Sequence, residues 1–214
     1  MVSPVERELQ NLATQFLLHI AERPEQKAFL VTCPRAGEGT TTILSRVGLA
    51  LAEISRLSVL LADGNLRSPE MHAVWGVPLS PGISDALVEG NLEAAIQRTR
   101  CPSLSLLPAG NPCANPMELF LSQGFKDAVV RLRQKFDLIL FDSAPLLVCK
   151  DALALGSGLD GAVLVVRSRF TVRRSTQRCL EMLSDRGIPV HAAVLNRKRR
   201  QVPKLFMTLF NLQE

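Results

Sequence analysis

A glycine-containing segment, residues 34–42, has the composition and position of a phosphate-binding loop. It reads PRAGEGTTT and lies between a short apolar run and a helical pattern. Glycines let the backbone approach an anion closely, and the N–H groups at the start of the following helix face that anion. We therefore predict a nucleotide site made by Gly37, Glu38, Gly39, Thr40, Thr41 and Thr42. A tight strand-to-helix turn without a ligand is the alternative for this loop alone.

The loop departs from the usual G-x-x-x-x-G-K-[ST] pattern at two positions, since Pro34 stands at the first glycine and Thr40 at the lysine, and the lysine is the departure that matters. Gly39 occupies the second glycine and Thr41 the magnesium-binding hydroxyl, but Thr40 occupies the lysine position. That lysine normally neutralises the β- and γ-phosphates while charge develops during phosphoryl transfer. A threonine offers only a dipole there, so we expect weak binding of ATP or ADP and little catalysis.

Two aspartates end apolar, strand-like runs further along the chain. Asp63 ends SVLLAD and Asp142 ends DLILFD. Because ligands bind at the carboxyl ends of parallel strands, both carboxylates are expected beside the loop. Oxygen ligands suit Mg²⁺, which keeps several of its waters. Thr41, Asp63 and Asp142 are therefore the predicted magnesium site, and the two aspartates are the candidate catalytic groups.

The elements that must position these residues alternate along the chain. Apolar runs predict strands at 28–32, 58–63, 104–107, 137–142, 161–166 and 190–195. Helical patterns lie at 3–23, 41–54, 84–96 with a break at Gly90, 125–136 and 171–186. This order predicts an α/β fold with a doubly wound, mainly parallel sheet and helices on both faces. We expect one domain over residues 1–202 and an amphipathic tail over 203–214.

Charge is distributed unevenly over the 214 residues, whose net charge is +5. Residues 167–214 hold 11 Lys/Arg and 3 Asp/Glu, a balance of +8, so residues 1–166 sum to −3. Such a basic end can face an anionic membrane, nucleic acid or an acidic partner, or can simply be solvated. No apolar run reaches the roughly 18 residues of a membrane span, and no signal-peptide pattern opens the chain. We expect a cytoplasmic protein without a nucleic-acid partner.

The end of the chain combines basic and apolar residues. A basic run, RKRR, occupies 197–200, and Pro203 suits the start of a short helix. Its apolar side chains can share one face, as in segments that lie on a membrane surface. Three roles stay open for residues 203–214, namely packing on the domain's own core, contact with an anionic membrane, and docking in a partner's groove.

Three motifs together resemble the bacterial tyrosine kinases of capsule and exopolysaccharide export, which lie within the P-loop ATPases that include MinD and ParA. AGEGTTT (36–42) is similar to their P-G-E-G-K-S-T loop, and VLLADGNLRSP (59–69) to their V-L-L-I-D-A-D-L-R-x-P motif. FDLILFDSAP (136–145) is similar to F-D-x-V-I-I-D-T-P-P. The match runs in order from about residue 7 to residue 196. It adds Arg67 to the predicted nucleotide-binding residues and implies a membrane co-polymerase as partner.

Departures from the family pattern all point to a degenerate member. Besides Thr40, Asn65 replaces an aspartate that is a candidate general base, and an amide cannot accept a proton as a carboxylate can. The ring-forming E-x-x-R-x-x-R pattern falls on Arg7, Gln10 and Ala13, and the chain has no tyrosine. The resemblance therefore implies a pseudokinase, peripheral at the inner face of the cell membrane, that oligomerises without the usual ring motif. An active ATPase or kinase acting in trans, with Arg35 or Arg67 supplying the lost charge, and a MinD-like positioning ATPase are the alternatives.

Overall fold

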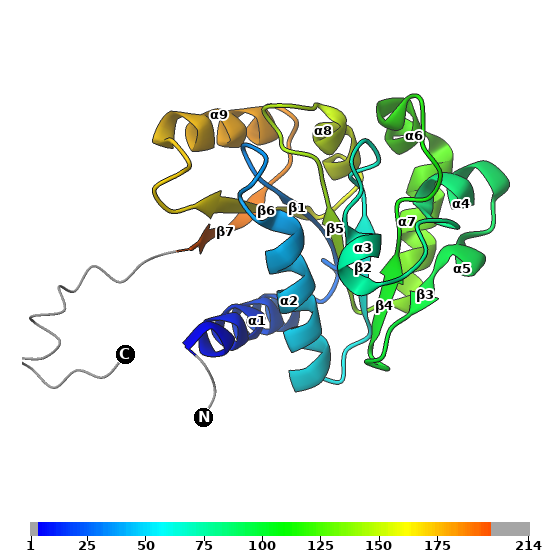
Figure 1. The fold of residues 1–214 in the computed structure, drawn as a ribbon, viewed down its shortest axis with the longest axis horizontal. Helices are drawn as coiled ribbons and strands as arrows, with labels where there is room; N and C mark the ends of the chain where they lie inside the picture. The colour runs from blue at the N-terminus through cyan, green and yellow to red at the C-terminus, as the bar shows by residue number, and fades with distance from the viewer. Residues whose placement is uncertain (1–3, 198–214) are drawn as a thin grey trace, which may run out of the picture.

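The computed structural model describes residues 4–197, with side chains from Glu6 onward, so the predicted tail at 203–214 lies outside the described residues. A seven-stranded sheet in the order β3-β4-β2-β5-β1-β6-β7 forms the centre of the molecule (Figure 1). Every neighbouring pair is parallel except β3 with β4. The predicted α/β fold with a doubly wound, mainly parallel sheet is confirmed. The strands are β1 (Ala28–Thr32), β2 (Val59–Asp63), β3 (Gln97–Arg98), β4 (Leu104–Leu107), β5 (Leu138–Asp142), β6 (Gly161–Arg167) and β7 (Val190–Asn196).

The central strands are apolar on both sides because helices cover both faces of the sheet. All five residues of β1, of β2 and of β5 are buried. Alternate residues of one strand pack into different clusters, so that Leu30 joins one core and Phe29 the other. A strand buried in this way has its polar residues at its ends, which is where the two aspartates lie.

Helices divide between the two faces according to the cores they contribute to. One core receives residues from α1 (Pro4–Glu22), α2 (Thr40–Ile54) and α3 (Met71–Trp75). The other receives residues from the remaining six helices. These are α4 (Ile83–Glu89), α5 (Leu92–Ala95), α6 (Pro116–Leu121), α7 (Gln123–Lys135), α8 (Asp151–Gly156) and α9 (Arg173–Ser184).

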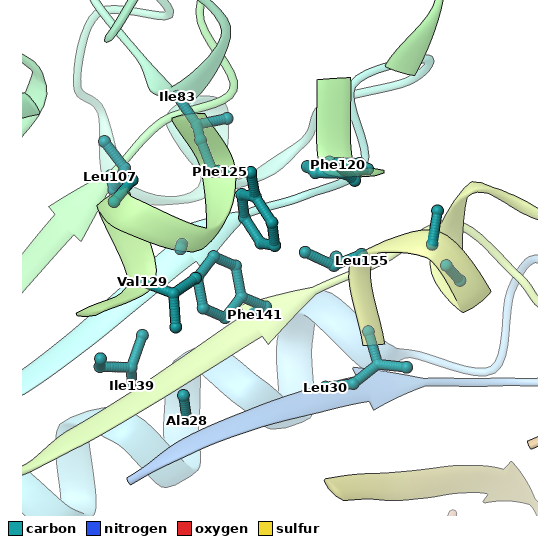
Figure 2. Packing of buried hydrophobic residues seen from close by; sticks show 14 of the residues in the cluster. Ala28, Leu30, Ile83, Leu107, Phe120, Phe125, Val129, Ile139, Phe141 and Leu155 are labelled. Carbon is teal, nitrogen blue, oxygen red and sulfur yellow. The ribbon is translucent and has the colours of Figure 1, made fainter. Parts of the chain in front are cut away.

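Aromatic rings fill the centre of the second core (Figure 2). Phe125 of α7 contacts Phe120 of α6 edge-on at a centroid distance of 5.3 Å. It also contacts Phe141 of β5 at 6.0 Å. Each of the three side chains is at most 2% exposed, so together they fix the two helices against the sheet.

Several short elements were not predicted from the sequence. Helix α6 has six residues and therefore shows little periodicity, although Asn115 caps it by accepting a hydrogen bond from the Glu118 N–H. Helices α3 and α8 and the two-residue strand β3 are also too short for a pattern to appear. The predicted break at Gly90 is confirmed, since this residue has φ 76° and ends α4.

Within residues 4–197, no helix combines the length and apolar character that crossing a bilayer requires.

Candidate nucleotide site

The phosphate loop connects the end of β1 to the start of α2 and depends on two glycines. Gly37 and Gly39 have φ values of 84° and 86°, a left-handed conformation that other residues adopt only with strain. A Cβ at Gly39 would also lie 2.6 Å from the side-chain nitrogen, Nδ2, of Asn196. The loop therefore has the backbone shape and the strand-to-helix position that an anion site needs.

Three loop side chains lie where the phosphate pattern did not require them. Thr40 is 6% exposed, and its buried hydroxyl has no hydrogen-bond partner within residues 4–197. Glu38 is fully buried, and neither carboxylate oxygen has a hydrogen-bond partner in the described part of the chain. Burial raises the pKa of this carboxyl. Thr42 is exposed on the first turn of α2. For these three residues, the predicted anion site would therefore use the backbone groups and not the side chains.

The two predicted aspartates are brought together at one edge of the sheet. Asp63 and Asp142 are direct partners in the register of β2 with β5. The Thr41 hydroxyl donates a hydrogen bond of 2.5 Å to Asp142 Oδ2, and the Ser143 N–H donates to Oδ1 at 3.0 Å. Thr41, Asp63 and Asp142 thus form one connected group next to the loop, as the sequence predicted.

Both carboxyl groups are poorly solvated. Burial raises the pKa of Asp142 to about 7, and the neighbouring Asp63 carboxylate adds to this increase. Burial likewise raises the pKa of Asp63 to about 6. Two buried carboxyls that repel each other are stabilised in their charged forms by a cation between or beside them.

The donor set fits Mg²⁺. A threonine hydroxyl and two carboxylates are the oxygen ligands that this ion takes, usually with several waters and phosphate oxygens. In the part of the chain that the structure describes, no group of three or more His, Cys, Asp or Glu side chains could hold a metal by itself. A magnesium ion at this site would therefore be held by Thr41 and Asp142, with Asp63 nearby, and would reach full coordination only with water and nucleotide oxygens.

Asp63 has a second task in the loop that follows β2. Its Oδ1 accepts a hydrogen bond from the Asn65 N–H, and its Oδ2 accepts one from the Met71 N–H, both at 3.1 Å. The Asn65 side chain donates to the Ser68 carbonyl at 2.7 Å. Asn65 therefore stabilises its own turn, while Asp63 fixes the two ends of the segment that leads into α3.

Arg67 contacts α8 in this structure. Its Nε lies 2.5 Å from Asp151 Oδ2 and 3.2 Å from the Cys149 sulfur. Burial alone would raise the pKa of Asp151, but the Arg67 hydrogen bonds outweigh it and hold that pKa below its usual value. The described hydrogen bonds of Arg67 are thus with the start of α8 rather than with the phosphate loop, where the resemblance had placed it.

Two residues that sequence reasoning missed contact the loop directly. Arg167 donates from its guanidinium to the Gly37 carbonyl at 3.0 Å, and Asn196 donates from its side-chain amide to the Glu38 carbonyl at 2.7 Å. They end β6 and β7, the two strands beyond β1. Their position at strand carboxyl ends was the available signal, because ligands bind at that edge of the sheet.

The helix that should carry the ring-forming pattern packs on the core. Arg7 and Gln10 are exposed on α1, but Ala13 is completely buried. An arginine at this last position would have to reach solvent through the packed layer between α1 and the sheet.

Comparisons with known proteins find bacterial tyrosine-protein kinases among the sequences similar to this chain. No protein-family model matches the chain. Tyrosine-protein kinase YwqD of Bacillus subtilis is 28% identical over 176 residues, which cover 82% of this chain and 74% of YwqD. The putative tyrosine-protein kinase CapB of Staphylococcus aureus is 24% identical over 196 residues, 91% of this chain and 85% of CapB.

Solved structures that are similar to this chain also include a kinase domain. The VpsO kinase domain superposes with a TM-score of 0.80 at 26% identity, covering 91% of this chain and 96% of VpsO. The chimerical protein CapA2B2 gives 0.86 at 23% identity, covering 92% of this chain and 87% of the chimera. The septum site-determining protein MinD of Pyrococcus horikoshii, solved with Mg-ADP, gives 0.67 at 21% identity over 86% of this chain and 77% of MinD, a likeness of fold alone.

Proposed function

Because the chain is a homologue of the bacterial tyrosine-protein kinases, with their P-loop fold, we propose that it is a degenerate member that binds nucleotide weakly and regulates through protein contacts. The process is the biosynthesis and export of an exopolysaccharide or capsule. Its partner is a membrane co-polymerase, and the domain acts as a peripheral protein at the inner face of the cell membrane. The similarity to CapB and to the CapA2B2 chimera supports this assignment.

The observation that carries the proposal is the position of Thr40. The side chain at the lysine position is short, 6% exposed and directed into the protein. The lysine position therefore supplies no cation for the β- and γ-phosphates. Glu38, buried in the same loop, adds a carboxyl whose charged form burial disfavours. Charge stabilisation during phosphoryl transfer is the main contribution of such sites to catalysis, and here it is reduced.

The remaining groups are sufficient for binding. Backbone N–H groups of the loop and of the α2 start can donate to phosphate oxygens. Thr41 and Asp142 would hold the magnesium ion, which supplies the charge neutralisation that the protein lacks. Asn65, where the family has a candidate base, is an amide and cannot take a proton from an attacking hydroxyl. The chain has no tyrosine, so it cannot be its own tyrosine substrate.

Calorimetric titration and a hydrolysis assay test the proposal together. We expect weak, Mg²⁺-dependent binding of ATP that Asp142→Ala abolishes. Thr40→Lys should strengthen binding by about 5- to 150-fold, the equivalent of about 1–3 kcal/mol for a hydrogen bond to a charged group. Thr42→Lys is the matched control, because it adds the same charge on the exposed side of the same helix turn.

Two results would contradict the proposal. Turnover by the unaltered chain at about 1 per second or faster, a typical kinase rate, would show that the lost lysine has been replaced in function. Binding that is indifferent to both Mg²⁺ and Asp142→Ala would show that the nucleotide site lies elsewhere.

A working ATPase or trans-acting kinase is the second candidate, and one contact favours it. The Arg167 guanidinium, which donates to the Gly37 carbonyl, is a cation that directly contacts the loop. If Arg167 replaces the missing lysine, Arg167→Ala should abolish hydrolysis as well as ATP binding. Under the non-catalytic proposal, the unaltered chain already shows no measurable hydrolysis, and the same change weakens ATP binding only.

A further inference from the structure

The turn between β6 and α9 carries an unusual concentration of positive charge. Residues 161–180 include five arginines and no aspartate or glutamate. Arg169, Arg173 and Arg174 are exposed and, within residues 4–197, take part in no salt bridge. The fifth, Arg178, pairs with Glu181 on the same helix. We call residues 167–174 the arginine loop.

The end of β7 lies beside this loop. Strands β6 and β7 are parallel neighbours, and the Ser168 N–H donates to the Asn196 carbonyl at 2.9 Å. Figure 1 shows the turn from β6 into α9 and the end of β7 on the same side of the sheet. Arg197, which follows β7, is exposed. Arg197 therefore adds a further exposed cation at the edge of the sheet where the arginine loop lies.

Apolar side chains lie among these arginines. Phe170 is 46% exposed and Val172 is 57% exposed. The Arg167 guanidinium lies over the Phe170 ring at 4.7 Å from its centroid. Arg169, at the tip, has φ 59°, a left-handed conformation that is uncommon for a residue with a side chain.

Hydrogen bonds close the loop and hold this display. The Arg167 N–H donates to the Thr171 hydroxyl at 2.8 Å, and the Thr171 N–H donates back to the Arg167 carbonyl at 2.9 Å. The loop is therefore a closed turn that presents an apolar tip surrounded by cations. Such a surface suits the boundary between lipid headgroups and acyl chains, where apolar groups insert and basic groups contact phosphates.

We infer that the arginine loop is a membrane-contact surface that places this edge of the fold against an anionic phospholipid bilayer. Arginine pairs with phosphate groups through two parallel N–H donors, which matches a layer of headgroups. Phe170 and Val172 distinguish this partner from nucleic acid, because a contact with phosphates alone has no use for exposed apolar tips. The inference rests on the membrane-peripheral role in the proposed function and deepens it, and it differs from the tail expectation because it concerns residues that the structure describes.

Vesicle co-sedimentation of the full chain tests it. Vesicles of phosphatidylcholine alone are compared with vesicles that also contain phosphatidylglycerol. We expect binding only to the anionic vesicles. Each basic residue near such a surface contributes to the binding free energy, so that the loss of two should weaken vesicle binding roughly thirtyfold. Reversing the two charges should weaken binding further. The first variant is therefore Arg173→Glu with Arg174→Glu. Its matched control is Arg98→Glu with Arg100→Glu, an equal charge change on exposed residues at the β3 edge of the sheet.

A second pair tests the apolar tip. Val172→Asp should weaken vesicle binding at least tenfold, whereas Val88→Asp, at an 80% exposed valine of α4, should have much less effect. All substituted residues are exposed, and unchanged melting temperatures check that each variant folds.

Three results would overturn the inference. The first is that the unaltered chain does not bind to anionic vesicles. The second is that the loop variants and their controls bind equally well. The third is that the chain binds to a DNA duplex, and that Arg173→Glu with Arg174→Glu removes this binding while Val172→Asp leaves it intact. ATP titration of the same variants is expected to be unchanged, so a failure here is distinguishable from a failure of the proposed nucleotide site.

Discussion

Replacing Asp142 by asparagine is expected to stabilise the domain at alkaline pH. Burial raises the pKa of this carboxyl from an ordinary 3.8 to about 7. The folded chain therefore binds more protons than the unfolded chain between these two values, and stability falls as pH rises through that window. Each pKa unit corresponds to about 1.4 kcal/mol, so the charged carboxylate costs about 4 kcal/mol of folding free energy above pH 7. Between about pH 5 and about pH 8, roughly 3 kcal/mol of this cost develops.

Urea unfolding without Mg²⁺ measures the effect. The asparagine carbonyl can still accept the Thr41 hydrogen bond, but the amide nitrogen cannot accept from the Ser143 N–H. That loss does not depend on pH, whereas the effect of removing the charge does. We expect the stability gain of Asp142→Asn over the unaltered chain to be larger at about pH 8 than at about pH 5 by about 2–3 kcal/mol. Asp185→Asn, at the exposed end of α9, is the control that removes one carboxylate without changing the site.

Magnesium ions provide the internal check. If Thr41, Asp63 and Asp142 hold Mg²⁺, adding the ion at about pH 8 should stabilise the unaltered chain and leave Asp142→Asn unaffected. A stability difference between the two chains that does not depend on pH would refute the reasoning. So would an asparagine variant that is less stable than the unaltered chain at about pH 8.

Three further changes have defined outcomes in urea unfolding. Arg67→Ala should destabilise the domain above about pH 5, and this effect should shrink as the pH falls below 3.8, the ordinary pKa of the carboxyl, since the low pKa of Asp151 in the folded state adds stability only while that carboxyl is charged; a loss independent of pH would contradict this. Gly39→Ala should cost more than Gly37→Ala, because both have positive φ and need about 1–2 kcal/mol for it, but only at Gly39 would the new Cβ meet a neighbour within 3 Å. Phe125→Ala should cost about 3–5 kcal/mol, as expected for a buried ring whose cavity two helices cannot close; a cost below about 1 kcal/mol would show that the core of Figure 2 repacks.

Much of the fold could be predicted because the central strands leave a strong local signal. A strand buried on both faces must be apolar throughout, and its carboxyl end is where a polar residue can first reach the site. The sequences ending in Asp63 and Asp142 show both features, so their meeting beside the loop followed from the parallel topology. The structure confirms this arrangement through the register of β2 with β5.

The contacts that were missed depend on distances that no local pattern contains. Arg167 and Asn196 reach the loop only because β6 lies next to β1 in the sheet and β7 lies next to β6. The sequence separation from their loop partners is 130 residues for Arg167 and 158 for Asn196. Arg67 is a different case, since its place in a family motif suggested the nucleotide, whereas its ion pair with Asp151 joins the segment after β2 to the start of α8. Side-chain direction is set by packing, which a motif does not specify.

The hydrogen bonds of Asp63 bear on how degenerate enzymes are recognised. This carboxylate holds the N–H groups of Asn65 and Met71 and so shapes the segment between β2 and α3. Mutation that removed it would leave two buried or half-buried donors without an acceptor, which destabilises the fold whether or not any chemistry takes place. Purifying selection for folding alone would therefore preserve an aspartate at this position long after catalysis was lost. In inactive relatives of this fold, the lysine position is the better indicator of lost activity, because it takes no part in the hydrogen bonds that shape this segment.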